Sequence, residues 1–176
     1  MENQKASVQK IAMNYGLLLA LATIVLSVIV YVMGMHLDQP WWQSVLNFIF
    51  MITAIMYGLK AYKNEGDGYL TISEALKTGL AISLVAGIIG SIFSYLFVTF
   101  IEPDFIPQML EATQTKMINE NPQMTEAELE MAMGITEKFM TPWFITAMGL
   151  IASLFFGFLI SLLGGLILKQ NRPENY

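Results

Sequence analysis

The sequence contains no cysteine, a single histidine and little charge. Without cysteine the chain has neither a disulfide framework nor a site for thiol-linked lipidation. Asp, Glu, Lys and Arg make up only 13% of the 176 residues, whereas 55% are hydrophobic and the mean hydropathy is +0.56. A soluble domain of this size cannot bury so much apolar surface, so the composition indicates a membrane protein.

Four stretches contain no charged residue, and each is at least as long as the ~20 residues that cross a hydrocarbon core about 30 Å thick. We therefore predict an all-α fold, a polytopic bundle of four transmembrane helices that forms a single membrane domain over residues 1–176. The first apolar run is too long for the core of a signal peptide and ends at no small-residue cleavage site, so we expect a retained helix. The charge-free stretches are 11–37, 39–59, 78–101 and 139–168, and the predicted spans are 11–35, 41–61, 76–101 and 142–168.

The cations predict the orientation of these spans, because Lys and Arg resist translocation across the membrane. In the four-span arrangement seven of the nine cations lie on one side, and only Lys116 and Lys138 lie on the other. We therefore predict cytoplasmic N- and C-termini in a multi-pass protein of the inner membrane, with residues 102–141 in the periplasm. Tryptophan favours the headgroup level, and the three predicted interface anchors at the periplasmic ends of the spans are Trp41, Trp42 and Trp143.

Residues 102–141 carry eight acids and two lysines, a net charge of −6. No basic face is available to neutralise phosphates, so we expect no nucleic-acid partner. Pro107 in a first turn, Pro122 after a last turn, and Thr125 with Glu128 in a capping box predict two helices. We expect an amphipathic hairpin that packs on the outer surface or rests in the interface. Its predicted apolar faces contain Ile106, Leu110, Thr113 and Met117 in the first helix, and Leu129, Ala132, Met133, Thr136, Phe139 and Met140 in the second.

Small residues recur at every fourth position of the last two spans. In a soluble helix each glycine would cost about 1 kcal/mol relative to alanine. In lipid, however, helices associate through close backbone approach, which small residues permit. We therefore predict that the third and fourth spans pack closely, either within one protomer or across a dimer. The predicted helix-packing residues are Gly79, Ser83, Gly87 and Gly90 in the third span, and Gly149, Ser153, Gly157, Ser161 and Gly165 in the fourth.

The polar residues inside the spans are neutral, and hydroxyl groups there usually bond to the carbonyls of their own helix. Asn47 is among the most costly of them to bury and is a candidate for an interhelical hydrogen bond. Ionisable groups at membrane depth usually mark catalysis or ion coupling, and these spans have none. No metalloprotease, nucleophile-elbow or P-loop motif occurs. We therefore predict no catalytic, cofactor-binding or metal-binding residue and no cofactor.

Two metal-binding hypotheses are weak. Met131 and Met133 offer thioethers to Cu(I), but neighbours two apart point to different faces of a helix. Glu65 and Asp67 lie in a glycine-containing cluster that faintly resembles a calcium loop, yet apolar residues occupy the positions of further oxygen ligands. A turn followed by a capping box of Thr71 and Glu74, which begins the third span, explains that segment better.

Three features together resemble the DUF4199 family of small bacterial membrane proteins, which occurs mainly in Bacteroidota and has no known function. They are the segment "GYLTISEALKTGL" that enters the third span, the segment "FIEPDF" that leaves it, and the four-span layout with a helical outer loop. The resemblance covers nearly the whole chain. It implies a membrane location and this architecture, and it brings no catalytic residue with it.

Three classes of function are compatible with this pattern. We expect a non-enzymatic accessory or interaction subunit, in contact with membrane lipids and with a larger membrane complex or another copy of itself. The alternative is a component of an oligomeric permease or channel for small solutes or ions, because a single apolar bundle has no evident aqueous lumen. An enzyme that uses the outer-loop acids Glu126, Glu128 or Glu130 is the third class.

Overall fold

The computed structural model describes residues 6–37 and 40–172, and these residues form a helical bundle with a helical hairpin at one end. Among these described residues, four helical segments are long and apolar enough to cross a membrane. The predicted all-α, polytopic architecture is therefore confirmed. The elements are α1 (Val8–Val32), α2 (Trp41–Glu65), α3 (Ile72–Leu96), the π-helix η1 (Phe97–Ile101) that continues α3, α4 (Phe105–Glu120), α5 (Glu126–Phe139) and α6 (Pro142–Leu168).

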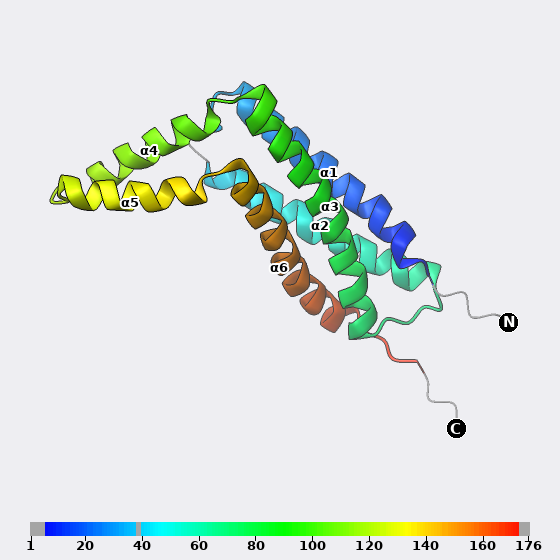
Figure 1. Ribbon diagram of the computed structural model, residues 1–176. Coiled ribbons are helices and arrows are strands. Elements are labelled where there is room, and N and C mark those ends of the chain that lie inside the picture. The colour runs from blue at the N-terminus through cyan, green and yellow to red at the C-terminus, as the bar shows by residue number, and fades with distance from the viewer. Residues whose placement is uncertain (1–5, 38–39, 173–176) are drawn as a thin grey trace.

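Helix α3 is the central element of the bundle. It shares its most extensive interface with α6 and its next most extensive with α1, and α2 packs against α1, α3 and α6. The α4–α5 hairpin extends from one end of the bundle, and the first and last described residues lie at the other (Figure 1). We call these the hairpin end and the terminal end. The close pairing of α3 with α6 occurs within a single chain.

The buried core lies mostly toward the terminal end. The buried positions of α2 fall between residues 55 and 62, those of α3 between 75 and 86, and those of α6 between 157 and 165. Ile55, Leu59 and Ile82 are completely buried there. Many large apolar side chains are exposed on the outside of the bundle, among them Leu163 and Ile167. That distribution fits helices whose outer surfaces contact lipid.

The starts of two helices follow from local sequence. The Thr71 hydroxyl accepts a hydrogen bond from the Glu74 backbone N–H at 3.2 Å, and the Glu74 carboxylate accepts one from the Thr71 N–H at 2.9 Å. Thr125 and Glu128 form the same reciprocal pair at the start of α5. Both predicted capping boxes are thus confirmed, and each satisfies two backbone donors that the first helical turn leaves free.

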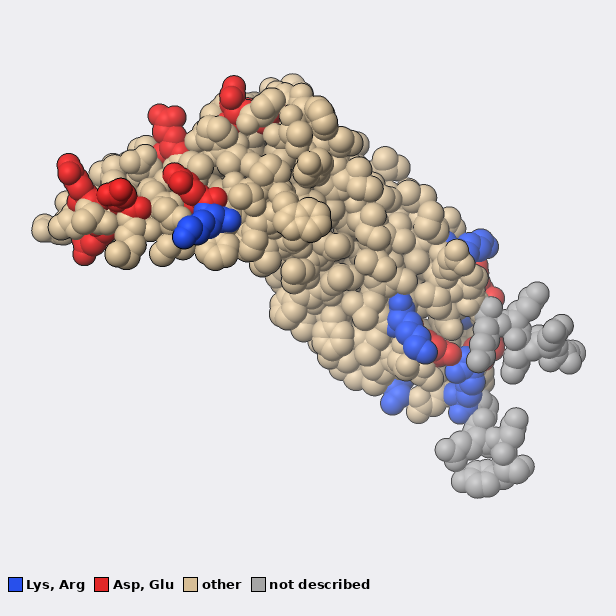
Figure 2. Space-filling model, in the orientation of Figure 1, with Lys and Arg blue, Asp and Glu red and all other residues tan. Residues whose placement is uncertain are grey.

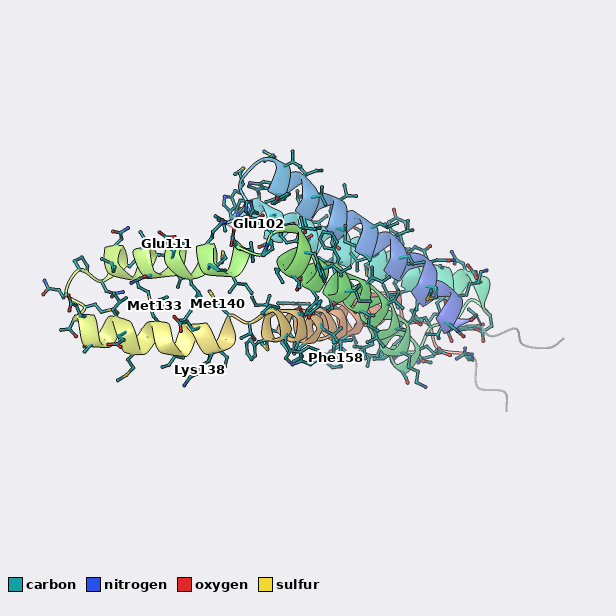
Figure 3. The ribbon with its side chains drawn as sticks, turned by 45° about the horizontal axis from the view of Figure 1, so that its top comes forward. Glu102, Glu111, Met133, Lys138, Met140 and Phe158 are labelled. Atoms are coloured by element: carbon teal, nitrogen blue, oxygen red, sulfur yellow. The ribbon has the colours of Figure 1, made fainter. Side chains whose placement is uncertain are left out.

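The α4–α5 hairpin is held together by the apolar faces that the sequence predicts. Figure 3 shows Met133 and Met140 turned toward α4, whereas Lys138 points away from it. Phe139 differs from the expectation, because it is 52% exposed and its ring lies 4.9 Å from that of Phe144. Phe139 is the last residue of α5, so its side chain meets the chain that turns into α6 rather than α4.

Charge is separated along the molecule. Acidic side chains cover the hairpin, most cations gather at the terminal end, and uncharged surface occupies the length between them (Figure 2). Lys138 is a cation on the hairpin, on the side of α5 that points away from α4 (Figure 3). Together with the apolar lengths of the four long helices, this arrangement gives the bundle an apolar belt between its two ends, as a membrane-spanning segment requires.

Candidate functional site

Glycine and serine interlock across the interface between α3 and α6. A β-carbon added to Gly79 would lie 2.6 Å from Ser161 Cβ, and one added to Gly157 would lie 2.6 Å from Ser83 Cβ. Ser83 and Ser161 are completely buried. Each helix thus offers a glycine to the serine of the other, so no larger residue fits at either glycine.

Hydrogen bonds cross the same interface. The Ser153 hydroxyl donates to the Ser83 carbonyl at 3.1 Å, and the Ser91 hydroxyl donates to the Thr146 carbonyl at 3.4 Å. Ser83 and Ser161 instead donate to carbonyls of their own helices, those of Gly79 and Gly157. Gly87 and Gly165 also lie close to the opposite helix, 2.7 Å from Leu150 and 2.8 Å from Ala75 when measured from an added β-carbon.

Gly90 and Gly149 do not take part in this packing. An added β-carbon at either position would meet no other described part of the chain within 4 Å, apart from its own stretch of helix. The sequence predicts both as helix-packing residues, but neither glycine touches the opposite helix, although Ser91 next to Gly90 bonds across the interface. Both glycines line a cavity instead.

The three tryptophans lie at the hairpin end, where α2 and α6 begin. Trp41 and Trp143 are 77% and 76% exposed, and Trp42 is half-buried. Their position at one end of the apolar belt is the place that an interface anchor needs, and the anchoring itself stays a prediction.

A cluster of charged groups ties the end of the chain to the turn between α2 and α3. Arg172 Nε donates to Asp67 Oδ2 at 2.6 Å, and another nitrogen of the guanidinium donates to Glu74 Oε1 at 3.0 Å. Gln170 and Leu70 exchange two backbone hydrogen bonds next to it. The hydrogen bonds from Arg172 hold the pKa of Asp67 below its ordinary value, and the two carboxylates raise the pKa of Arg172.

This cluster predicts a pH dependence at the terminal end. A carboxyl group with a lowered pKa stabilises the folded state above its ordinary pKa of about 4, and that contribution is lost as the pH falls through the lowered value. A spin label at position 171 should therefore be immobilised from pH 8 to 5 and become mobile only below about pH 4, where Asp67 is protonated. Arg172→Gln should give the mobile spectrum at every pH. Lys10→Gln, which removes the exposed Lys10–Glu65 pair, is the control and should change nothing.

Two adjoining cavities open the bundle at the hairpin end. Their volumes are about 540 and 830 Å³, within the range of about 300–1,000 Å³ that ligand pockets occupy. The core closes mostly the terminal half of the bundle, and α3 extends beyond the start of α6 at the hairpin end (Figure 1). Six residues line both cavities: Thr23, Ser44, Asn47, Gly90, Ser94 and Ile145.

Most of the polar groups that line these cavities are neutral. Thr23 and Ser27 come from α1, Ser44 and Asn47 from α2, and Ser94 from α3. Thr23 donates its hydroxyl to the Ala20 carbonyl at 2.9 Å. Asn47 Oδ1, by contrast, is buried and has no hydrogen-bond partner within the described part of the chain. The predicted interhelical bond through that oxygen is not made.

His36 lines the smaller cavity, of about 540 Å³, where this cavity meets the hairpin. Its Nε2 lies 3.0 Å from Glu102 Oε1, and its ring packs edge-on to Tyr31 with centroids 5.0 Å apart. Phe97 and Phe105 complete the aromatic cluster. His36 Nδ1 and Glu102 Oε2 are buried, and neither has a hydrogen-bond partner among residues 6–37 and 40–172. The glutamate is visible at the junction of η1 with α4 (Figure 3).

The metal hypotheses find no geometry to support them. Within the residues that the structure describes, no group of three or more His, Cys, Asp or Glu side chains is placed to hold an ion. Met131 is 72% exposed, whereas Met133 faces α4, so the two thioethers point apart. Asp67 bonds to Arg172 and to the Tyr69 N–H, which is the geometry of a turn.

Sequence reasoning missed the cavity and the terminal cluster. It identified Asp67 and Glu74 by their local roles and did not pair them with Arg172, which is 105 residues away from Asp67 in the chain. The signal that the sequence offered for the cavity was the presence of polar residues, such as Asn47, inside the apolar spans. Hydropathy does not show whether such a residue faces a neighbouring helix or an opening.

Together these features define a polytopic helical membrane protein with four spans, a closed terminal half and an open half beneath a helical hairpin. The sequence model of one family, described as "Protein of unknown function (DUF4199)", matches residues 14–170. The chain therefore belongs to the DUF4199 family, as its motifs indicate. Comparison with curated proteins and with solved structures finds no match.

Proposed function

We propose that this protein is a non-enzymatic accessory subunit of the bacterial inner membrane, and that its hairpin contacts a partner protein on the periplasmic side. The shape of the hairpin is the observation that carries the proposal. No residue of α4 or α5 is buried, and the pair extends away from the bundle (Figure 1). Because α3 and α6 already pack side by side, a short loop would join them, so the hairpin is not needed for their connection.

The side of the membrane that we propose for the hairpin follows from the distribution of charge. Lys and Arg gather at the terminal end, and cation-rich segments stay in the cytoplasm. The hairpin end would then face the periplasm, with Trp41 and Trp143 at the headgroup level. Segment 102–141 carries a net charge of −6, so a partner that docks on it would present a basic surface.

The two outer faces of α5 support different contacts. Met131, Ile135 and Phe139 are all more than half exposed and recur every four residues, which places them in one stripe that leads to Trp143 on α6. This stripe, with Lys138 beside it, would rest on the membrane surface, where a lysine reaches the phosphates. Glu126, Glu130 and Glu137 share another face, which would point to water and to the partner.

Site-specific photo-crosslinking in native membranes tests this proposal. A photoreactive residue at position 137 should give a protein adduct that weakens as salt rises from about 0.05 to 0.5 M, because screening shortens the reach of charge. The same residue at position 135 should label lipid, and at the exposed, distant position 166 it should give no salt-dependent protein adduct. Lipid adducts alone at position 137, at low salt, would contradict the proposal.

The alternative of a solute pathway makes a different prediction. The completely buried side chains of Ile55, Leu59 and Ile82 fill the terminal half of one copy, so a path would have to form between copies. Flux of small solutes through liposomes that contain the purified protein would then rise steeply with protein density. An accessory subunit gives no such flux.

A further inference from the structure

The cavity at the hairpin end reaches the outer surface between α2 and α6. Val45, Phe48 and Phe156 line the larger cavity and are each more than 40% exposed. Phe48 and Phe156 pack edge to face with ring centroids 5.9 Å apart, and this pair borders the opening of the cavity, which we call its mouth. The mouth thus opens sideways from apolar stretches of two membrane-spanning helices, and a molecule that enters there comes from the hydrocarbon phase.

The interior of the cavity offers hydrogen bonds in an otherwise apolar setting. The Asn47 side chain lines both cavities, and its buried Oδ1 lacks a partner within residues 6–37 and 40–172. Buried polar groups cost free energy unless they are bonded, so such groups in native proteins nearly always have partners. Farther toward the hairpin, His36 Nδ1 is a second buried atom in the same condition. A hydroxyl group of a ligand could donate a hydrogen bond to Asn47 Oδ1 or to His36 Nδ1.

The charges around the cavity indicate a neutral ligand. None of the described residues that line the two cavities is a lysine or an arginine, so an anionic head group would be buried there without a cation. Among those described residues His36 is the titratable one, and it already pairs with Glu102. Hydroxyl or amide groups match the remaining Thr, Ser and Asn side chains without a charge to compensate.

We infer that this cavity binds a neutral lipid with a hydroxyl-bearing head, which enters sideways between α2 and α6. The head lies among Asn47, Ser44 and Ser94, and the acyl chain leaves past Phe48 and Phe156. Gly90 and Gly149 supply the space, because each lines the cavity and an added β-carbon there would meet no other helix of the described chain within 4 Å. The inference is independent of the partner protein proposed above.

The test uses the purified full-length chain in lipid nanodiscs with a monoacylglycerol that carries a diazirine in its acyl chain. Illumination should label peptides from α2 and α6 around Phe48 and Phe156. The di-O-methyl ether of the same lipid keeps the shape but has no donor, and it should bind about tenfold more weakly, as loss of a buried hydrogen bond implies. A phosphate monoester with the same chain should label no better than the ether.

Variants separate binding from folding. Asn47→Leu should reduce labelling about tenfold, whereas Asn14→Leu, the same change on the exposed face of α1, should leave it unchanged. Gly90→Leu fills open space, so it should fold normally and lose the labelling. Equal labelling by all three lipids, or wild-type labelling of both Gly90→Leu and Asn47→Leu, overturns the inference. Competition by free glycerol as effective as that by the unlabelled lipid would show a water-soluble ligand and would overturn it as well.

Discussion

Replacing Gly157 by leucine should lower the stability of the bundle by about 3 kcal/mol, the upper part of the usual range for overpacking a core. The added β-carbon would lie 2.6 Å from Ser83 Cβ, and that atom belongs to the buried face of α3. Neither side chain has a rotamer that relieves the overlap, so the two helices must move apart. Their separation would also break the nearby bond from Ser153 to the Ser83 carbonyl.

The measurement is thermal unfolding of the purified protein in detergent, followed by tryptophan fluorescence. A loss of about 3 kcal/mol corresponds to a drop in Tm of about 6–12 °C for a chain of this size. Gly149→Leu is the matched control, because it makes the same change on the same helix at a position with open space. Equal losses in the two variants would mean that glycine itself, and not the contact with Ser83, carries the effect.

Truncating Ile82 to alanine should cost about 2 kcal/mol, the lower end of the range for such changes in soluble proteins. Ile82 is completely buried where α1, α2 and α3 meet, with Gly58 against its side chain and Gly16 against its carbonyl. For a membrane protein, moving a methyl group from lipid into the protein core gains little free energy, because acyl chains are as apolar as the core. The remaining cost is the lost packing around the cavity that the smaller side chain leaves.

Ile92→Ala is the control for this variant. Ile92 lies on the same helix but is 57% exposed on its outside, so its truncation should change stability by less than about 0.5 kcal/mol. The same thermal measurement compares both variants with the unchanged protein. If Ile92→Ala were as damaging as Ile82→Ala, the exposed face of α3 would be covered by another protein surface rather than by lipid.

The elements of this fold were predictable because their signals are local. Charge-free length located the four spans, and the residue types of Thr71, Glu74, Thr125 and Glu128 located two helix starts. Helical periodicity likewise placed Met133 and Met140 on the inner face of the hairpin. The prediction for Phe139 was wrong, because Phe139 is the last residue of α5 and helical periodicity no longer fixes the direction of a side chain at a helix end.

The candidate site was much less predictable. Glycines 79, 90, 149 and 157 look alike in the sequence, yet two of them touch the opposite helix and two line a cavity. The difference depends on where the α3–α6 interface closes, and no local pattern records it. Arg172 presents the same difficulty, because its two carboxylate partners lie about a hundred residues away along the chain.

The sequence by itself determined that the chain is a four-span membrane bundle with an acidic helical hairpin, because hydropathy, capping and charge act over one or two turns of a helix. Only the tertiary structure decided which small residues pack, where the open half lies and which polar groups stay unbonded inside it. Those properties depend on the register and relative lengths of helices that are distant in sequence. Close packing in lipid is sensitive to both, since a single β-carbon separates contact from overlap.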